Sequence, residues 1–299
     1  MKAIEINGLT KQYGACRAVD DLNFDVECGE MIGFLGVNGA GKSTTINMLS
    51  TILKPDKGRA MVGGFELGRD DIDIRKTIGV VYQQNVLDDI LTVRENIATR
   101  ARLAGVNRDD LDKRLKEIGS LLKLEDILNK RYKVLSGGQK RRCEIASALI
   151  HAPKILFLDE PTTGLDPATR IEVWEAVKSL RDNKNMTVFL TTHYMEEAAC
   201  ADHIVIIDKG RKMAEGTPFE LKEKYAKDRL RIFFETGNTE MIEKKITGLD
   251  FALQPYGADI YIGDSFEALA ICERLRGSID GFEVIQGNMD DVFLKVTRG

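Results

Sequence analysis

The chain has 299 residues, of which 43% are apolar and 30% are charged, and its formal net charge is −4. A chain of this length and apolar content can bury a sizeable core and suggests about two domains, which excludes disordered and collagen-like classes. The acidic balance also disfavours a protein whose main role is to coat nucleic acid.

The sequence carries no signal that would place the protein in or beyond a membrane. Its apolar runs fall far short of the ~20 residues that cross a bilayer, and the residues after Met1 lack the pattern of a signal peptide. The five cysteines occur singly, without a C-x-x-C pair, which indicates reduced thiols rather than disulfides or a zinc site. We therefore expect a cytoplasmic protein.

Strand patterns of two kinds occur in the first two thirds of the chain. Residues 3–26 alternate between apolar and polar, as in half-buried antiparallel strands. Residues 31–37, 155–158 and 188–190 are continuous apolar runs, typical of parallel strands covered on both faces, and each precedes a loop and helical sequence. The alternation predicts an α/β fold with a doubly wound core and an N-terminal antiparallel β subdomain.

Residues from about 90 to 150 predict a helical subdomain between the core strands. Thr92 and Glu95 have the spacing of a capping box. Further on, Leu111, Leu115 and Ile118 recur at helical intervals. The segment is therefore interpreted as a mostly helical insertion into the core.

The last third of the chain predicts a second, smaller domain. Residues 208–211 resemble a hairpin turn, and the polar stretch 222–228 marks a boundary. The sequence then predicts strands at 230–234, 251–254, 259–262 and 282–286, helices at 239–246 and 266–275, and a short helix at 290–296. The order β-α-β-β-α-β indicates a ferredoxin-like α+β domain. We expect a first domain over residues 1–222 and an accessory domain over 227–299.

A glycine-rich motif lies at the end of the first continuous apolar run. Its residues are Gly36, Val37, Asn38, Gly39, Ala40, Gly41, Lys42 and Ser43, which match G-x-x-x-x-G-K-[ST]. Glycines let the backbone point several N–H groups at one anion, and the following helix (44–53) adds the partial positive charge of its N-terminus. Lys42 adds a full charge, and Ser43 offers a hydroxyl to Mg²⁺. The motif predicts a P-loop NTPase (RecA-like) core.

Two carboxylates, Asp159 and Glu160, follow the buried run at 155–158. A parallel strand would deliver Asp159 to the carboxyl edge of the sheet, beside the phosphates and the metal. Glu160 can accept a proton from an attacking water near the γ-phosphate, whereas Asp159 holds the hydrated Mg²⁺. The pair predicts a hydrolytic site next to the phosphate loop.

A second surface for an anion is predicted before the helical run at 140–151. Ser136 and Gln139 have the spacing of a capping box, and Gly137 and Gly138 lie between them. A capped helix N-terminus with two glycines leaves N–H groups open to a phosphate. The sequence therefore contains two phosphate cradles.

These motifs resemble those of the ATP-binding subunits of the ABC transporter family over about residues 1–220. The resemblance implies that Tyr13 stacks on adenine, that Gly36 to Thr44 form the phosphate loop, and that Gln83 is the Q-loop glutamine, a Mg²⁺ ligand and γ-phosphate sensor. It also implies that Leu135 to Gln139 are the family signature, that Asp166 lies in the D-loop, and that His193 is the switch histidine. ATP and Mg²⁺ are the implied ligands, and Lys42, Glu160 and His193 the implied catalytic residues.

Two details complicate the resemblance. Val37 stands where the family usually has proline, at a position that shapes the entry of the loop. Gln84 directly follows Gln83, so the Q-loop assignment has a one-residue ambiguity. His151 and His203 match no motif and are expected to be structural.

The family arrangement implies a dimer. Two such subunits stack head to tail, and the signature of one closes on ATP held by the other. The residues agree, because Lys42 and Ser136 are far apart in the chain and on different lobes, so the two cradles serve one nucleotide only across a dimer. We expect a homodimer that ATP holds together, with a heterodimer of related ATPase subunits as the alternative.

Looser strings at 91–96, 191–197 and 290–294 resemble the drug-resistance export branch of the family. They imply an ATPase subunit that powers export of a drug, peptide or lipid-like molecule, docked through residues 83–96 on integral membrane permease subunits at the inner face of the cell membrane. A membrane-complex ATPase that signals or remodels the envelope stays open, as does, less favoured, a soluble ABC ATPase of DNA repair or translation. We expect no nucleic-acid partner. The C-terminal domain is interpreted as dimer-stabilising or regulatory, with a ligand sensor as the alternative.

Overall fold

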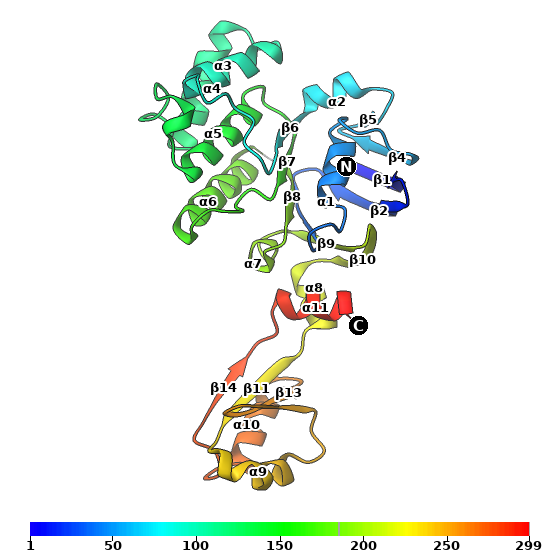
Figure 1. Cartoon of the computed structure of the whole chain (residues 1–299), viewed down its shortest axis with the longest axis vertical. Coiled ribbons are helices and arrows are strands. Elements are labelled where there is room, and N and C mark those ends of the chain that lie inside the picture. The colour runs from blue at the N-terminus through cyan, green and yellow to red at the C-terminus, as the bar shows by residue number, and fades with distance from the viewer. Residues whose placement is uncertain (185, 299) are drawn as a thin grey trace. The chain divides into compact units, whose positions relative to one another are not determined.

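The computed structural model describes residues 1–184 and 186–298 of the chain (Figure 1). The chain divides into two compact units between Glu215 and Gly216. Within the described residues, no helix has both the length and the apolar character to cross a membrane.

A six-stranded sheet forms the centre of the first unit, in the order β10-β9-β3-β8-β7-β6 (Figure 1). Its strands are β3 (Met31–Leu35), β6 (Ile78–Val81), β7 (Ile155–Asp159), β8 (Thr187–Thr192), β9 (His203–Asp208) and β10 (Arg211–Gly216). The five strands from β9 to β6 pair in parallel. β3, β7 and β8 are fully buried, as their continuous apolar sequences predict, which confirms the α/β core.

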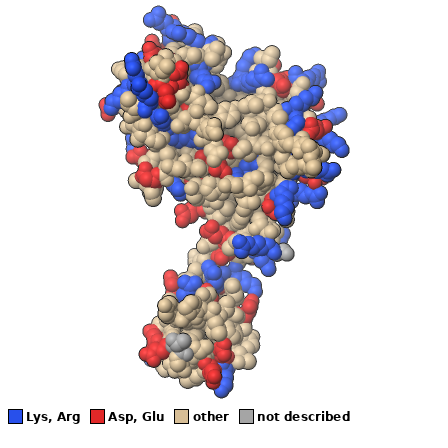
Figure 2. All heavy atoms as spheres, viewed as in Figure 1, with Lys and Arg blue, Asp and Glu red and all other residues tan. Residues whose placement is uncertain are grey.

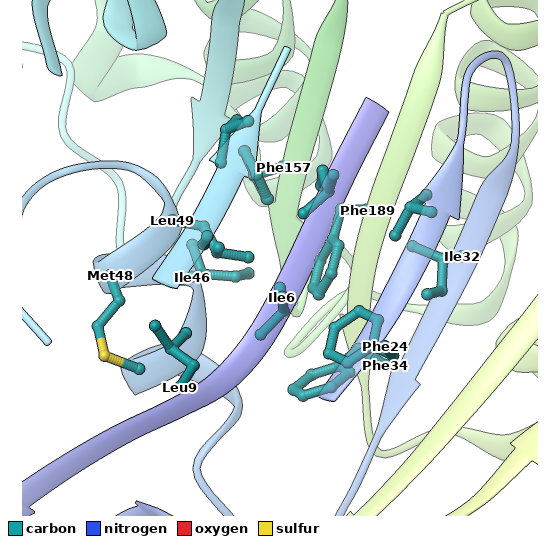
Figure 3. Close-up of a cluster of buried hydrophobic side chains, with 14 of the residues drawn as sticks. Ile6, Leu9, Phe24, Ile32, Phe34, Ile46, Met48, Leu49, Phe157 and Phe189 are labelled. Atoms are coloured by element: carbon teal, nitrogen blue, oxygen red, sulfur yellow. The ribbon is translucent and has the colours of Figure 1, made fainter. Parts of the chain in front are cut away.

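An antiparallel sheet packs against this core, in the order β2-β1-β4-β5. Its strands are β1 (Lys2–Tyr13), β2 (Cys16–Glu27), β4 (Lys57–Val62) and β5 (Phe65–Glu66). The predicted N-terminal antiparallel subdomain is thus confirmed, although β4 and β5 lack the alternation that would have indicated them. Phe24 of β2 packs beside Phe34 and Phe189 of the central sheet, with ring centroids 5.5 and 6.2 Å away (Figure 3).

Helix α1 (Lys42–Leu49) enters the same core through buried Ile46, Met48 and Leu49 (Figure 3). The helix is shorter than the sequence predicts, because Thr51 adopts a left-handed conformation with φ of 66°. The N–H groups of Ile52 and Leu53 then both donate to the Asn47 carbonyl, which closes the helix end. The phosphate loop is therefore mounted on a short helix held firmly by the core.

Helices cover the rest of the first unit. They are α2 (Asp71–Thr77), α3 (Val93–Leu103), α4 (Arg108–Leu121), the 3₁₀ helix η1 (Tyr132–Val134), α5 (Gly137–Leu149), α6 (Pro167–Lys184) and α7 (Met195–Ala198). The capping box predicted at Thr92 and Glu95 opens α3. Helix α5 contacts α3, α4 and α6, so the predicted helical subdomain is built around the helix that follows Ser136.

The second unit has its own four-stranded sheet and core. Its elements are α8 (Pro218–Tyr225), β11 (Asp228–Phe233), the 3₁₀ helix η2 (Thr236–Asn238), α9 (Thr239–Ile246), β12 (Phe251–Gln254), β13 (Gly257–Ile262), α10 (Ser265–Arg274), β14 (Gly281–Ile285) and α11 (Met289–Arg298). The sheet order β12-β13-β11-β14 with antiparallel neighbours is that of a ferredoxin-like domain, as predicted. Helix α8 packs against α11 within this unit.

Candidate functional site

Four neighbouring strands of the central sheet end at one edge and deliver the site. β3, β8, β7 and β6 lie side by side, and the residues that follow them include Lys42, His193, Glu160 and Gln83. Ligands of open α/β sheets bind at this carboxyl edge. The structure thus gathers four predicted residues from segments that are far apart in the sequence.

The phosphate loop runs from Gly36 to the first turn of α1. Gly41 has φ of 109°, and a Cβ atom there would lie 2.3 Å from the carbonyl oxygen of Ala18, so only glycine fits. The loop is tied by hydrogen bonds from Ala40 N to the Val37 carbonyl and from Gly210 N to the Ala40 carbonyl, each 3.0 Å. Asn38, Gly39 and Ser43 are exposed on it. The loop is preformed, with its face open to a ligand.

Lys42 points back across the phosphate loop. Its Nζ donates to the carbonyl oxygens of Gly36 at 2.8 Å and Val37 at 3.3 Å. The same Nζ lies 3.2 Å from Oε1 of Glu160, and both side chains are buried. A buried ammonium is stable here because it is neutralised and hydrogen-bonded. An arriving phosphate would compete with Glu160 for this cation.

Glu160 is the centre of the cluster. Its Oε2 accepts hydrogen bonds from Gln83 Nε2 at 3.2 Å and Thr163 Oγ1 at 3.1 Å. Its backbone has φ of 46°, a strained value for a residue other than glycine, held by donation from Glu160 N to the carbonyl and hydroxyl oxygens of Thr191. Burial raises the pKa of the carboxyl, but Lys42, together with the nearby His193, outweighs it and holds that pKa below its usual 4.5. The group is therefore an ionised proton acceptor at neutral pH.

His193 approaches Glu160 from the end of β8. Its Nδ1 lies 3.2 Å from Oε2 of Glu160, yet the geometry is not that of a hydrogen bond, and this buried nitrogen has no hydrogen-bond partner among the described residues. An unsatisfied buried nitrogen calls for an explanation such as a missing ligand. The imidazole is positioned to act on a group that binds beside Glu160.

Asp159, Ser43 and Gln83 supply the oxygen atoms that Mg²⁺ prefers. Asp159 is buried at the end of β7, where its Oδ1 accepts from Thr191 Oγ1 at 2.6 Å. Gln83 donates through its amide nitrogen to Glu160, which leaves its amide oxygen for another partner. This contact also distinguishes Gln83 from Gln84 within the Q-loop. The donor set fits a magnesium ion.

The predicted second cradle stands at the start of α5. Ser136 Oγ accepts from Gln139 N at 3.3 Å, and Ser136 N donates to Gln139 Oε1 at 3.1 Å, so the capping box is formed. Gly137 is exposed, and Gly138 lies against Thr169 of α6. In residues 1–184 and 186–298, no hydrogen bond joins this segment to the Lys42 cluster. Among the described residues, the capped start of α5 thus takes no part in the hydrogen bonds around Glu160.

Two further predicted residues lie at the rim of the first unit. Tyr13 is 50% exposed at the end of β1, with Lys11 Nζ 5.8 Å from its ring centre. Asp166 is exposed before α6, where its carboxylate accepts from Thr169 N at 3.1 Å and from Thr169 Oγ1. Neither side chain is among the contacts of Glu160, so their predicted roles in binding remain predictions.

Two buried residues of α5, which no sequence motif indicated, hold the Q-loop, residues 82–87. Arg141 donates to the carbonyl oxygens of Tyr82, Asp159 and Pro161. One turn later, Glu144 Oε1 accepts from Val86 N, Leu87 N and the Tyr132 hydroxyl at 2.8, 3.1 and 2.8 Å. Burial lowers the pKa of Arg141 to about 10 and raises the pKa of Tyr132. Charged side chains inside the helix after Ser136 were the available signal, because they need buried partners.

Comparisons with known proteins agree with this geometry. A family model described as ABC transporter matches residues 19–163. The chain is 38% identical over 306 residues to the daunorubicin/doxorubicin resistance ATP-binding protein DrrA of Streptomyces peucetius, covering 99% of this chain and 92% of that protein. It is 36% identical over 303 residues to the Nod factor export ATP-binding protein I of Rhizobium etli, covering 99% and 94%.

Solved structures show the same architecture. An ATP-binding subunit of an ABC transporter has a TM-score of 0.68 at 28% identity and covers 75% of this chain and 93% of its own. A dimeric ATP-binding cassette bound to ADP and Pi has a TM-score of 0.65 at 29% identity and covers 72% and 98%. The long matches to DrrA and to the Nod factor export protein extend through both compact units. The chain therefore belongs to the ABC transporter family.

Proposed function

We propose that this chain is the ATP-binding and ATP-hydrolysing subunit that powers an ABC exporter of drug, peptide or lipid-like molecules. The observation that carries the proposal is the convergence of Lys42, Gln83 and His193 on the buried carboxylate of Glu160, beside an open phosphate loop. The relatives named for drug resistance and Nod factor export support the export direction.

The proposed hydrolysis follows from the placement of these residues. The phosphate loop, Gly36 to Thr44, holds the phosphates through backbone N–H groups, and Lys42 turns from Glu160 toward the added negative charge. The freed Glu160 carboxylate accepts the proton of the attacking water, and the unpartnered Nδ1 of His193 orients on the terminal phosphate. Ser43, Asp159 and Gln83 would hold Mg²⁺, which would neutralise negative charge on the phosphates. Tyr13 offers its exposed ring to adenine.

A second copy of the chain completes each nucleotide site in this proposal. Ser136 to Gln139 form a capped helix end with no bond to the Lys42 cluster of their own copy, so they are available to ATP bound by another copy. Asp166 lies near them, since Gly138 contacts Thr169, the residue that Asp166 accepts from. We propose a homodimer, and a heterodimer with a related ATPase subunit is the alternative.

A cavity of 370 Å³ supports docking on a permease subunit. It is lined by Tyr82, Val86, Arg100, Leu103, Glu144 and His151, among others, and exposed Ile90 lies in the adjoining loop. Its lining mixes apolar residues with polar and charged ones, as interfaces between proteins do, and could receive the end of a helix from an integral membrane protein. Docking there would hold the chain at the inner face of the cell membrane. Asp88, Asp89 and Arg94 lie in the predicted docking segment, residues 83–96, which also contributes Val86 to the cavity. Charge reversal at any of them is expected to abolish co-purification with the permease, and intact co-purification would contradict docking through this segment.

The other functions proposed from the sequence receive less support. On the face drawn in Figure 2, basic and acidic side chains are interspersed over the helical subdomain, unlike the continuous basic surface of a nucleic-acid binder. Signalling or envelope remodelling by a membrane complex would use the same ATPase cycle. ATP-dependent accumulation of substrate in vesicles that contain the whole complex distinguishes transport from that role.

Two roles are open to the C-terminal domain. We propose that it stabilises the dimer or regulates the ATPase, and a ligand sensor is the alternative. A cavity of 390 Å³ favours the sensor: it is lined by Tyr225, Lys227, Arg229, Tyr261, Asp291 and Lys295, among others. Arg229 Nε is buried without a hydrogen-bond partner among the described residues, which suits an anion. The dimer affinity of the chain without residues 216–299 tests the dimer-stabilising role. Loss of these residues should weaken the dimer if they stabilise it, and should leave the affinity unchanged if they only sense a ligand.

The decisive experiment is Glu160→Gln. We expect hydrolysis to fall at least ~100-fold, because a neutral amide cannot accept the proton, while ATP still binds and an ATP-bound dimer accumulates. Turnover by phosphate release, nucleotide affinity and dimerisation by light scattering provide the measurements. Glu172→Gln, at an exposed position of α6, is the control and should match the wild type. Wild-type turnover of the Glu160 variant would remove this residue from its catalytic role.

A further inference from the structure

The first turn of helix α6 carries an arginine, Arg170, that binds two loops of the site at once. Arg170 donates from Nε to the carbonyl oxygen of Leu165, at 3.1 Å, and from Nη2 to the hydroxyl of Tyr194, also at 3.1 Å. Its guanidinium carbon also lies 4.1 Å from the centre of the Tyr194 ring. A cation that lies over an aromatic ring and also directs N–H groups to two acceptors is characteristic of arginine. Arg170 thereby fixes Tyr194 relative to the backbone just before Asp166.

Tyr194 in turn packs on the imidazole that faces Glu160. The ring centres of Tyr194 and His193 are 4.1 Å apart at an angle of 37°. His193 Nδ1 makes no hydrogen bond within the described chain, so no directed bond at this nitrogen fixes the rotation of the ring. The neighbouring aromatic face restricts the orientation of the imidazole instead. The position of Tyr194 therefore decides how Nδ1 meets a group bound beside Glu160.

A second set of hydrogen bonds, which does not involve Arg170, connects the starts of the same two loops, next to β7 and β8. The buried carboxylate of Glu197 accepts from the hydroxyls of Thr162 and Thr192. This junction holds the ends of β7 and β8 together without Arg170. Loss of Arg170 would consequently leave the strand ends in place and free only the outer parts of the loops, at Leu165 and Tyr194.

We propose that Arg170 is a positioning residue that makes the orientation of His193 depend on the place of the loop containing Leu165 and Asp166. This inference rests on the proposed hydrolysis of ATP. The loop adjoins the cradle at Ser136, since Leu165 Cδ2 lies 3.5 Å from the Cβ position of Gly137. A nucleotide seated on that cradle would move the loop, and Arg170 and Tyr194 would transmit the movement to the imidazole. Closure of the dimer and alignment of His193 would then be one event.

The test is a double-mutant cycle on steady-state ATP hydrolysis by the full chain. Arg170→Met and Tyr194→Leu are each expected to lower kcat about tenfold, with KM for ATP within about twofold of wild type, because nucleotide affinity belongs to the phosphate loop. The double variant should be no slower than the worse single variant, since both changes break one connection. Tyr194→Phe keeps the ring and should retain most of the rate.

Arg181→Met is the matched control, since it removes an arginine of the same helix that pairs with Asp202 instead. It should leave kcat and KM unchanged. Multiplying losses in the double variant, a rise in KM equal to the fall in kcat, or an equal loss in Arg181→Met would overturn the inference. The proposed function fails separately if the wild-type chain shows no hydrolysis that depends on Glu160.

Discussion

Gly138 packs so closely against Thr169 that no larger residue fits at position 138. A Cβ atom there would lie 2.1 Å from Cγ2 of Thr169. We expect Gly138→Ala to destabilise the first unit by about 1–3 kcal/mol, because the α5–α6 packing must shift. Chemical denaturation of the wild type and the variant measures the change.

A second substitution distinguishes packing from ligand access at this glycine. Thr169→Ser removes the clashing methyl group but keeps the hydroxyl that donates to Asp166. The double variant Gly138→Ala with Thr169→Ser should recover the lost stability. If nucleotide must approach the Gly138 backbone, hydrolysis will stay low in this variant. Failure to recover stability would mean that the clash is not the cause.

The ion pair between Arg231 and Asp259 is expected to make the stability of the C-terminal unit depend on pH in the acid range. Arg231 donates from Nε and Nη2 to the two carboxylate oxygens of Asp259, at 2.6 and 3.0 Å. Hydrogen bonds from Arg231 hold the pKa of Asp259 below its usual 3.8. Because the folded state has the lower pKa, the pair stabilises the unit fully above that usual value and is lost as the pH falls through the folded pKa.

Asp259→Asn therefore should lower the stability of the C-terminal unit at neutral pH. The difference from wild type should begin to shrink as the pH falls below 3.8, where the carboxyl of the unfolded wild-type chain takes up a proton, and should be lost at the lower pKa of the folded state. Urea unfolding followed from pH 7 to pH 3 measures both effects. A difference that is independent of pH would show that the pair acts through packing and not through charge.

Individual site residues could be predicted where a motif fixes their position in the sequence. Lys42 and Glu160 were predicted from a loop motif and a strand end, and the structure brings them together. The choice between Gln83 and Gln84 could not be made, because it depends on which side chain turns toward Glu160. Arg170 lies outside the motifs, and its role depends on a tyrosine that follows another strand.

Helix α5 binds both ends of the Q-loop, residues 82–87. Arg141 holds Tyr82 at the start of the loop, and Glu144, one turn further, holds Val86 and Leu87 at its end. The two side chains lie on one face of the helix, since they are three residues apart. Gln83 sits between the two attachments and reaches Glu160. Movement of α5 must therefore move the Q-loop with it.

Removal of the Glu144 carboxylate should detach one end of that loop. Glu144→Ala leaves two backbone N–H groups and the Tyr132 hydroxyl without an acceptor, and we expect a loss of at least about 2 kcal/mol. Glu144→Gln should cost less, because its amide oxygen still accepts from two donors. Amide hydrogen exchange at residues 86 and 87 should rise in the same order. Unchanged exchange in the alanine variant would contradict the attachment.

Elements with a clear hydrophobic pattern could be predicted, and short or polar elements could not. The buried runs of β3, β7 and β8 and the capping boxes of α3 and α5 were each indicated by local sequence. β6 has only four residues and directly follows α2, so no window of the sequence isolates it. Its strand conformation comes from pairing with β7, a partner 77 residues further along the chain.

The two compact units should fold independently of each other. The second has a buried core of its own, which includes Leu230, Ile232, Ile242, Ile246 and Ile260. We predict that residues 1–215 alone form a folded protein that binds ATP, and that residues 216–299 fold as a separate fragment. Calorimetry of each fragment and nucleotide titration of the first provide the measurements.

The residue at which the chain is truncated should affect the first fragment, because α8 packs against α11 of the second unit. The sequence suggested a boundary between residues 222 and 227, whereas the compact units divide after Glu215. A fragment that ends at residue 226 would keep α8 without its packing partner and expose Leu221, which is buried in the full chain. It should aggregate more than the fragment 1–215. Equal solubility would show that α8 is stable without α11.

The ends of β3, β6, β7 and β8 carry the proposed catalytic residues, whereas the surface that we propose for a membrane partner lies on the loop and helix that follow Gln83. These two parts of the molecule can therefore change independently in evolution. Ile90 and Leu103 are exposed, so substitutions there are expected to leave strand pairing and the environment of Glu160 unchanged. Related proteins could thus acquire a different membrane partner through substitutions on this surface, while the residues around Glu160 stay the same.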